Sequence, residues 1–146
     1  MNKYQDFTYD LVPPTWPVCF IKSCPMAEDC IRHLAGTVLS DDVAFGAAVY
    51  PTALKNGKCC KFKQIRVIHA AWGFDTIFNQ VKRKDSASLR NSIKEYLGGH
   101  GTYYRYHNGK LLLTPEQQEW IVSLFLSYGY TENLKFDNYK DIYDFS

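Results

Sequence analysis

The cysteine pattern constrains this chain more than any other feature. Cys19, Cys24 and Cys30 lie in one Pro-rich N-terminal stretch, and Cys59 and Cys60 form an adjacent pair further along. An odd number of cysteines, behind a polar N-terminus without an apolar export segment, argues against a disulfide framework. In a reducing compartment such a cluster indicates either a metal site or a set of buried thiols.

Zinc is the cofactor that this ligand set favours, because zinc binds four thiolate or imidazole ligands in a tetrahedron. The expected ligands are Cys19, Cys24, Cys30 and one of Cys59 and Cys60. His33, one helical turn after Cys30, is a substitute ligand. The spacing lacks the C-x2-C hooks of zinc ribbons, so an iron–sulfur cluster is the alternative cofactor. Buried free thiols are the interpretation without a metal.

Length and composition favour one globular domain. The chain has 146 residues, 46% of them hydrophobic, and no apolar run reaches the roughly 18 residues of a membrane helix. We expect a mostly helical α+β domain over residues 1–146, with no membrane partner and a cytoplasmic location. Its parts are a cysteine-rich segment (1–61), a helix–helix–hairpin–helix core (62–129) and an aromatic, acidic strap (130–146).

Hydrophobic periodicity predicts a buried helix over Phe62–Arg83 and a second helix over Ser86–Leu97, ended by the glycine pair that follows. The dipeptide Asn108-Gly109 between β-prone segments predicts a hairpin over Thr102–Leu113. Thr114-Pro115-Glu116-Gln117 has the composition of a capping box and predicts a further helix that ends at Gly129.

Shorter elements are expected nearer the N-terminus. Asp29–Gly36 is typical of a short helix that ends at glycine. Ala44–Tyr50 is small and apolar, which indicates one buried strand. Leu54–Lys58 is expected to be a turn.

The net charge of +2 hides an uneven distribution of charged residues. The window from Lys55 to Lys110 holds 12 Lys or Arg against three acidic residues, so the rest of the chain is acidic. Such asymmetry indicates a basic face for an anionic partner, unless the acidic tail folds over it.

The expected order of helix, short break, helix and hairpin is that of a winged helix-turn-helix, which places its second helix in the DNA major groove. The candidate nucleic-acid-binding residues are Arg90, Asn91 and Lys94 on that helix and Arg105, His107 and Lys110 on the wing. Tyr103, Tyr104 and Tyr106 are alternatively suited to stacking on unpaired bases.

Catalytic motifs do not account for the chain. It contains no phosphate-binding loop, dinucleotide fingerprint, H-E-x-x-H helix or nucleophile elbow. The prediction is a non-enzymatic, metal-stapled regulator or binding module, with DNA or RNA as the specific partner of residues 55–110. A protein-interaction adaptor and an enzyme of unrecognised class are the alternatives.

Several motifs together resemble a family of small, cysteine-containing bacterial proteins of unknown function that are common in gut anaerobes. They are Cys24-Pro25 through Cys30, the later cysteine pair, Tyr103-Tyr104-Arg105-Tyr106 and Leu113-Thr114-Pro115-Glu116-Gln117. The resemblance covers the chain from about Asp10 to Asp144. It implies a bacterial cytoplasmic protein, and it brings no activity, ligand or catalytic residue.

Overall fold

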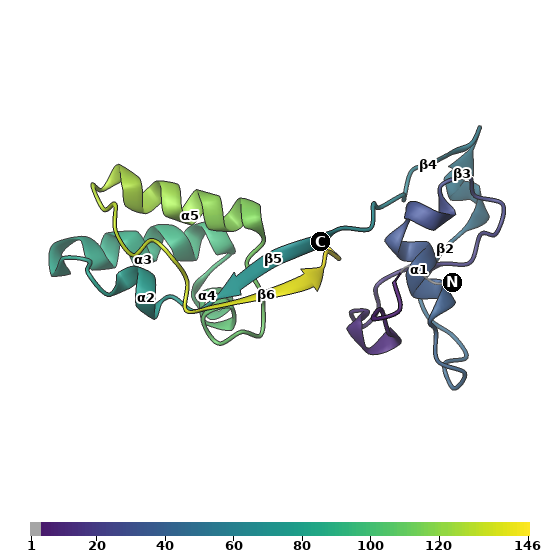
Figure 1. The fold of residues 1–146 in the computed structure, drawn as a ribbon, viewed down its shortest axis with the longest axis horizontal. Helices are drawn as coiled ribbons and strands as arrows, with labels where there is room; N and C mark the ends of the chain where they lie inside the picture. The colour runs from purple at the N-terminus through teal and green to yellow at the C-terminus, as the bar shows by residue number, and fades with distance from the viewer. Residues whose placement is uncertain (1–3) are drawn as a thin grey trace. The chain divides into compact units, whose positions relative to one another are not determined.

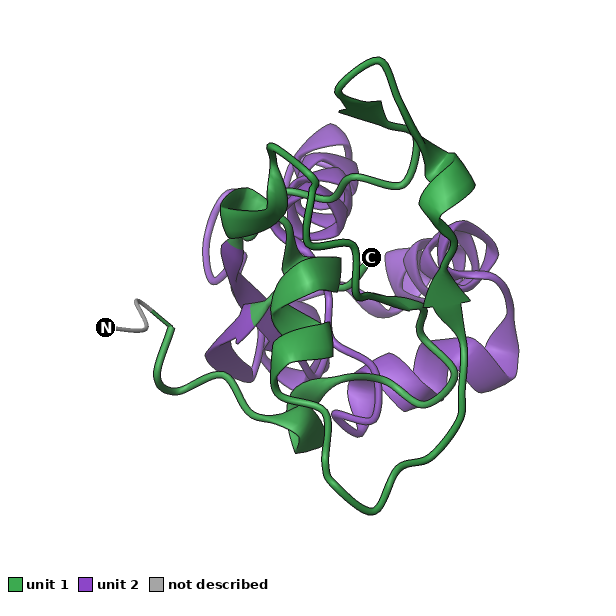
Figure 2. Ribbon diagram, turned by 90° about the vertical axis from the view of Figure 1, so that its right-hand side faces the viewer, with its two compact units in different colours: residues 1–66, 143–146 green, residues 67–142 purple. Residues whose placement is uncertain are grey.

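The computed structural model describes residues 4–146, which divide into two compact units. Unit 1 comprises residues up to Arg66 together with Tyr143–Ser146, and unit 2 comprises Val67–Ile142 (Figures 1 and 2). Both units combine helices with two-stranded sheets, which confirms the α+β class. In the described part of the chain, no helix has the length and apolarity needed to cross a bilayer.

Unit 1 consists of short elements joined by irregular chain. They are η1 (Tyr9–Leu11), β1 (Val18–Cys19), η2 (Ala27–Asp29), α1 (Ile31–Thr37), β2 (Ala48–Val49), η3 (Pro51–Ala53), β3 (Leu54–Lys55) and β4 (Lys58–Cys59). β1 pairs with β2 in parallel, and β3 pairs with β4 as an antiparallel hairpin. The predicted short helix is therefore present as α1, whereas the strand predicted over Ala44–Tyr50 is reduced to β2.

The hairpin of unit 1 forms where only a turn was expected. Asn56 and Gly57 connect β3 to β4 with φ values of 53° and 75°. Two successive positive φ values are what a tight two-residue hairpin turn requires, and Asn-Gly adopts them at the lowest steric cost.

Aromatic residues from both ends of the chain form the core of unit 1. The Phe7 and Tyr143 rings meet edge to face at 4.9 Å, and Trp16 meets Phe145 in the same way at 5.0 Å. The Trp16 indole N–H also donates to the Phe145 carbonyl at 3.1 Å. The last residues therefore contribute rings to the unit 1 core.

Unit 2 combines helices with one two-stranded sheet. Its elements are β5 (Val67–Trp72), α2 (Asp75–Phe78), α3 (Arg83–Leu97), α4 (His100–His107), α5 (Pro115–Ser127) and β6 (Asn138–Tyr143, whose last residue belongs to unit 1). β5 and β6 are hydrogen-bonded neighbours. The core is formed by Phe74, Leu89, Ile93, Leu113, Ile121 and Phe125, all of which are at most 1% exposed.

The helix predicted over Phe62–Arg83 is wrong. Residues 67–72 form β5, in which exposed Val67 and His69 alternate with buried Ile68 and Ala70. Gly73 then turns the chain at φ 88° before the four-residue α2 begins. The β-branched pair at the start of the segment and this glycine outweigh the helical spacing of the later apolar residues.

The hairpin predicted over Thr102–Leu113 is also wrong, because its first half is helix α4. Asn108 has φ −87° and caps that helix, so the turn lacks the conformation of a tight hairpin. The helix buries Tyr103 in the core of unit 2. Leu113 pairs instead with Ala71 in an isolated antiparallel bridge. Unit 2 therefore has no wing at this place.

Two predictions that rested on helix-end signals are confirmed, although α3 begins at Arg83 instead of Ser86 and α1 continues through Gly36. α3 ends at Gly98 in the left-handed conformation. α5 begins with a capping box, in which the Gln117 amide donates to the Thr114 hydroxyl at 3.3 Å and the Thr114 amide donates to the Gln117 side chain at 2.9 Å.

Candidate metal centre

Four of the five cysteines line one small cavity in unit 1. They are Cys19, Cys24, Cys30 and Cys59, and His33 lines the same cavity. The centre of a water-sized sphere could occupy only about 10 Å³ of the space between these side chains. That volume is enough for one water molecule or one ion of similar size.

Backbone contacts from distant segments hold the cavity wall together. Cys30 pairs with Gln64 in an isolated antiparallel bridge. Around that bridge, the Ile31 amide donates to the Lys63 carbonyl at 2.8 Å, and the Ile65 amide donates to the Asp29 carbonyl at 2.9 Å. These bonds fix the start of α1 against the chain that follows β4.

Gly36 permits a close approach of α1 to β1. A Cβ atom at this position would lie 2.3 Å from the Cys19 carbonyl oxygen and 3.3 Å from the Phe20 ring. The helix can therefore lie directly against the backbone of Cys19 only because this residue has no side chain.

Two of the four sulfur atoms accept backbone hydrogen bonds from the residue two positions later. The Lys61 amide donates to Cys59 Sγ at 3.4 Å, and Cys19 accepts in the same way from the Ile21 amide. An amide donor favours the thiolate over the thiol. Burial, however, raises the pKa of Cys19 above 9.0, and the neighbouring Cys30, Cys59 and Cys24 raise it further. Without a cation the Cys19 thiol therefore keeps its proton to a higher pH than a free thiol does.

His33 adds an imidazole with an unused nitrogen to the same wall. Among the described residues 4–146, one buried side-chain nitrogen or oxygen has no hydrogen-bond partner, and it is Nδ1 of His33. A buried polar atom without a partner costs roughly 1–3 kcal/mol, so its position needs an explanation.

The structure distinguishes the two adjacent cysteines. Cys59 is half-buried in β4 and reaches the four-thiol cavity. Cys60 is exposed and lines a separate hollow with Tyr50 and Thr52. Cys59 and not Cys60 is therefore the member of the pair that lines the four-thiol cavity.

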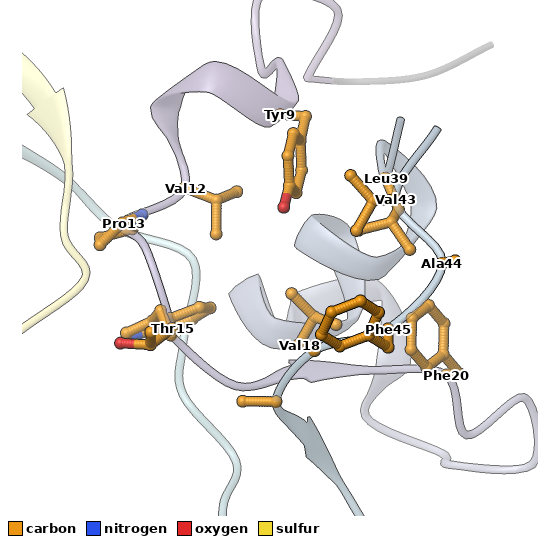
Figure 3. Close-up of a pocket in the computed structure, with 13 residues that line it drawn as sticks. Tyr9, Val12, Pro13, Thr15, Val18, Phe20, Leu39, Val43, Ala44 and Phe45 are labelled. Atoms are coloured by element: carbon orange, nitrogen blue, oxygen red, sulfur yellow. The ribbon is translucent and has the colours of Figure 1, made fainter. Parts of the chain in front are cut away.

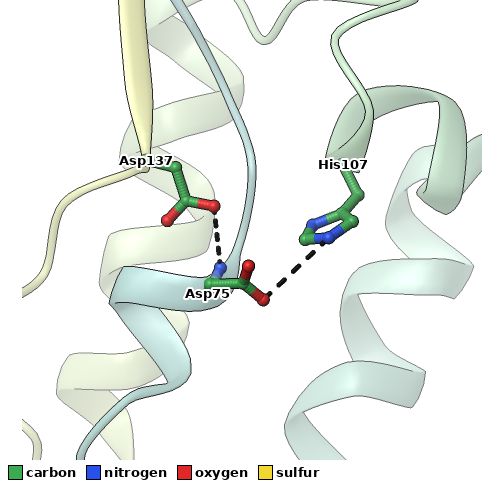
Figure 4. A group of neighbouring side chains, drawn as sticks. All are labelled: Asp75, His107 and Asp137. Atoms are coloured by element: carbon green, nitrogen blue, oxygen red, sulfur yellow. Dashed lines mark hydrogen bonds and ion pairs between the residues drawn. The ribbon is translucent and has the colours of Figure 1, made fainter.

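The thiols surround the cavity without forming a closed ligand shell. Within the described part of the chain, no three of the four sulfur atoms lie within 4.8 Å of one another. The three-residue group that meets this distance is Asp75, His107 and Asp137 in unit 2 (Figure 4).

The hydrogen bonds of that group explain its geometry without a metal. The Asp75 and Thr76 amides donate to the Asp137 carboxylate at 3.1 and 2.6 Å, which caps the start of α2. The Phe74 amide donates to His107 Nδ1 at 3.1 Å. The neutral ring then carries its proton on Nε2, which faces Asp75 at 3.9 Å. No ring nitrogen is left as a metal ligand.

The six predicted nucleic-acid-binding residues all lie in unit 2, but in a different setting. Arg90, Asn91 and Lys94 are on α3, as expected. Arg105 and His107 lie on helix α4 instead of a wing, and Lys110 follows it. His107 is committed to the Phe74 backbone.

A larger cavity of about 470 Å³ lies elsewhere in unit 1 (Figure 3). Its wall is formed mainly by apolar side chains such as Val12, Leu39 and Val43, and the Tyr9 hydroxyl points inward (Figure 3). None of its lining residues is a carboxylate, imidazole, thiol or amine. The wall therefore offers no acid–base pair for catalysis.

The cysteine pattern predicted which thiols belong together, but it did not predict the backbone contacts around them. The amides that donate to sulfur in unit 1, and separately the Asp137 cap of α2 in unit 2, depend on backbone positions that spacing does not reveal. Neither the curated proteins nor the solved structures contain a match to this chain. A family model does match residues 1–145, and the chain belongs to that family, which is described as a family of unknown function, DUF6078.

Proposed function

We propose that the protein is a non-enzymatic binding module whose unit 1 is stapled by a structural zinc ion. The proposed ligands are Cys19, Cys24, Cys30 and Cys59. The observation that carries the proposal is the convergence of these four thiols, from separate segments of the chain, on one cavity of single-ion size. Four protein ligands leave no open coordination position, so the zinc would be structural and not catalytic.

The electrostatics of the cavity support a cation. Burial, and to a smaller extent the neighbouring Cys30, Cys59 and Cys24, raise the pKa of Cys19 when no cation is present, and a zinc ion would reverse that effect by stabilising the thiolate. The amides of Ile21 and Lys61 then donate to charged sulfur, which is a stronger acceptor than a thiol. His33 Nδ1–H would gain a thiolate acceptor in the same step.

The size of the cavity favours zinc over an iron–sulfur cluster. The free space of about 10 Å³ between the thiols matches a single ion more closely than a cluster of several iron and sulfide atoms. Cys24 and Cys59 are only half-buried, so their side chains have room to turn inward when the metal binds.

Unit 1 also has few regular elements to stabilise it, so a bound metal ion would add needed stability. Its strands are two residues long and its α-helix has seven residues. Small domains with limited cores commonly depend on a metal or disulfides for stability.

Metal analysis of protein purified without oxygen tests the proposal. We expect one zinc ion and no iron per chain. The Cys59→Ser variant should lose the zinc, and the matched Cys60→Ser variant, altered at the neighbouring residue, should keep it. Metal-free wild-type protein would overturn the proposal, as would loss of zinc from Cys60→Ser with retention by Cys59→Ser.

A further inference from the structure

An exposed tyrosine lies beside a lysine and a histidine on the surface formed by α3 and α4. Tyr104 is 41% exposed. The Lys94 ammonium lies 5.7 Å from the centre of its ring, and the His100 ring meets it edge to face at 4.8 Å. We call Lys94, His100 and Tyr104 the α3–α4 surface.

The Tyr104 ring is held in place by buried neighbours. The Tyr103 ring, which is only 4% exposed, packs edge to face against it at 5.2 Å. Tyr103 is in turn stacked on the Phe74 ring at 4.7 Å. Because this support fixes the ring before any ligand arrives, binding loses little side-chain entropy.

The stretch of sequence that carries this surface is basic. From Lys82 to Lys110 the sequence has seven Lys or Arg against Asp85 and Glu95. Asp85 already accepts a hydrogen bond from the Tyr130 hydroxyl at 2.6 Å. The surplus of positive charge attracts an anionic chain such as a phosphodiester backbone.

We infer that the α3–α4 surface binds single-stranded nucleic acid. An unpaired base stacks on the exposed face of Tyr104, and the backbone phosphates pair with Lys94 and the neighbouring cations. A duplex would satisfy the charge but has its base faces covered, so it cannot use the ring. This inference is independent of the zinc proposal, since every residue involved lies in unit 2.

Fluorescence anisotropy with the full chain tests this inference. The probes are labelled oligothymidine, labelled oligouridine and a labelled duplex of equal length, each titrated over a range of salt concentrations. We expect both single strands to bind more tightly than the duplex. Tyr104→Ala should weaken single-strand binding about tenfold, and Tyr104→Phe should bind as the wild type does. Lys94→Gln should lower the slope of log K against log salt by about 0.7.

Two variants of the same unit serve as matched controls. Tyr139, on β6, is also 41% exposed, and Lys140 is an exposed lysine beside it. Tyr139→Ala and Lys140→Gln should leave binding unchanged. The inference is overturned if neither single strand binds at low salt, or if the duplex binds as tightly as the single strands. It is also overturned if Tyr104→Ala and Lys94→Gln bind as the wild type does.

Discussion

Replacing Gly36 with alanine should destabilise unit 1, because the new Cβ atom would lie 2.3 Å from the Cys19 carbonyl oxygen. Ordinary contact at this kind of site begins near 3.4 Å, so α1 and β1 must separate by about 1 Å. The obstacle is backbone, which cannot rotate away as a side chain can. Overpacking of this kind costs about 1–3 kcal/mol. Alanine returns up to about 1 kcal/mol through its better helix propensity. We therefore predict a net loss of about 1–2 kcal/mol.

Urea unfolding followed by circular dichroism measures this effect, with Gly46→Ala as the control. Gly46 has no atom within 4 Å of an added Cβ, so alanine there should be neutral or stabilise by up to about 1 kcal/mol. The shift of α1 should also move Cys19, so Gly36→Ala should bind zinc more weakly. If Gly36→Ala were as stable as Gly46→Ala, the proposed close packing of α1 on β1 would be refuted.

Three further predictions follow from the hydrogen bonds and pKa values. His33→Leu should weaken zinc binding about 10–100-fold in a chelator competition, because it removes a donor behind the thiolates; an unchanged affinity would exclude that role. Burial raises the pKa of Cys19, so the metal-free protein should lose stability as the pH rises above 9.0, which thermal unfolding at a series of pH values measures. The affinity for zinc should instead rise with pH, because zinc binds the thiolate. Burial acts to raise the pKa of Asp137, but the Thr76 and Asp75 amides outweigh it and the pKa falls below 3.8. Asp137→Asn should therefore destabilise unit 2 by about 1–2 kcal/mol at neutral pH. The difference in stability from the wild type should shrink as acid protonates the wild-type carboxylate, and a difference that does not change with pH would contradict this prediction.

Local signals predicted part of the fold well. The capping box at Thr114 and the glycine after Leu97 act within one helical turn, so the sequence displays them fully. The two Asn-Gly pairs show where such signals stop. At Asn56 the turn forms a hairpin, whereas at Asn108 the preceding helix continues because Tyr103 is buried in the core. That burial depends on distant residues, which a local pattern does not contain.

The candidate site shows the same division. Residue chemistry was enough to single out the thiols and to leave Cys59 and Cys60 as alternatives. Choosing Cys59 required the folded structure, in which Cys59 lines the four-thiol cavity and Cys60 lines a separate hollow. Cys19 and Cys59 each accept a hydrogen bond from the amide of the residue two positions later, and these bonds depend on how the backbone folds. Sequence spacing carries no sign of them.

X-ray absorption at the zinc edge of the purified protein tests the central claim most directly. The account predicts four sulfur ligands at about 2.3 Å from the zinc. A spectrum dominated by nitrogen and oxygen ligands at about 2.0–2.2 Å, as carboxylates and imidazoles would give, would contradict it.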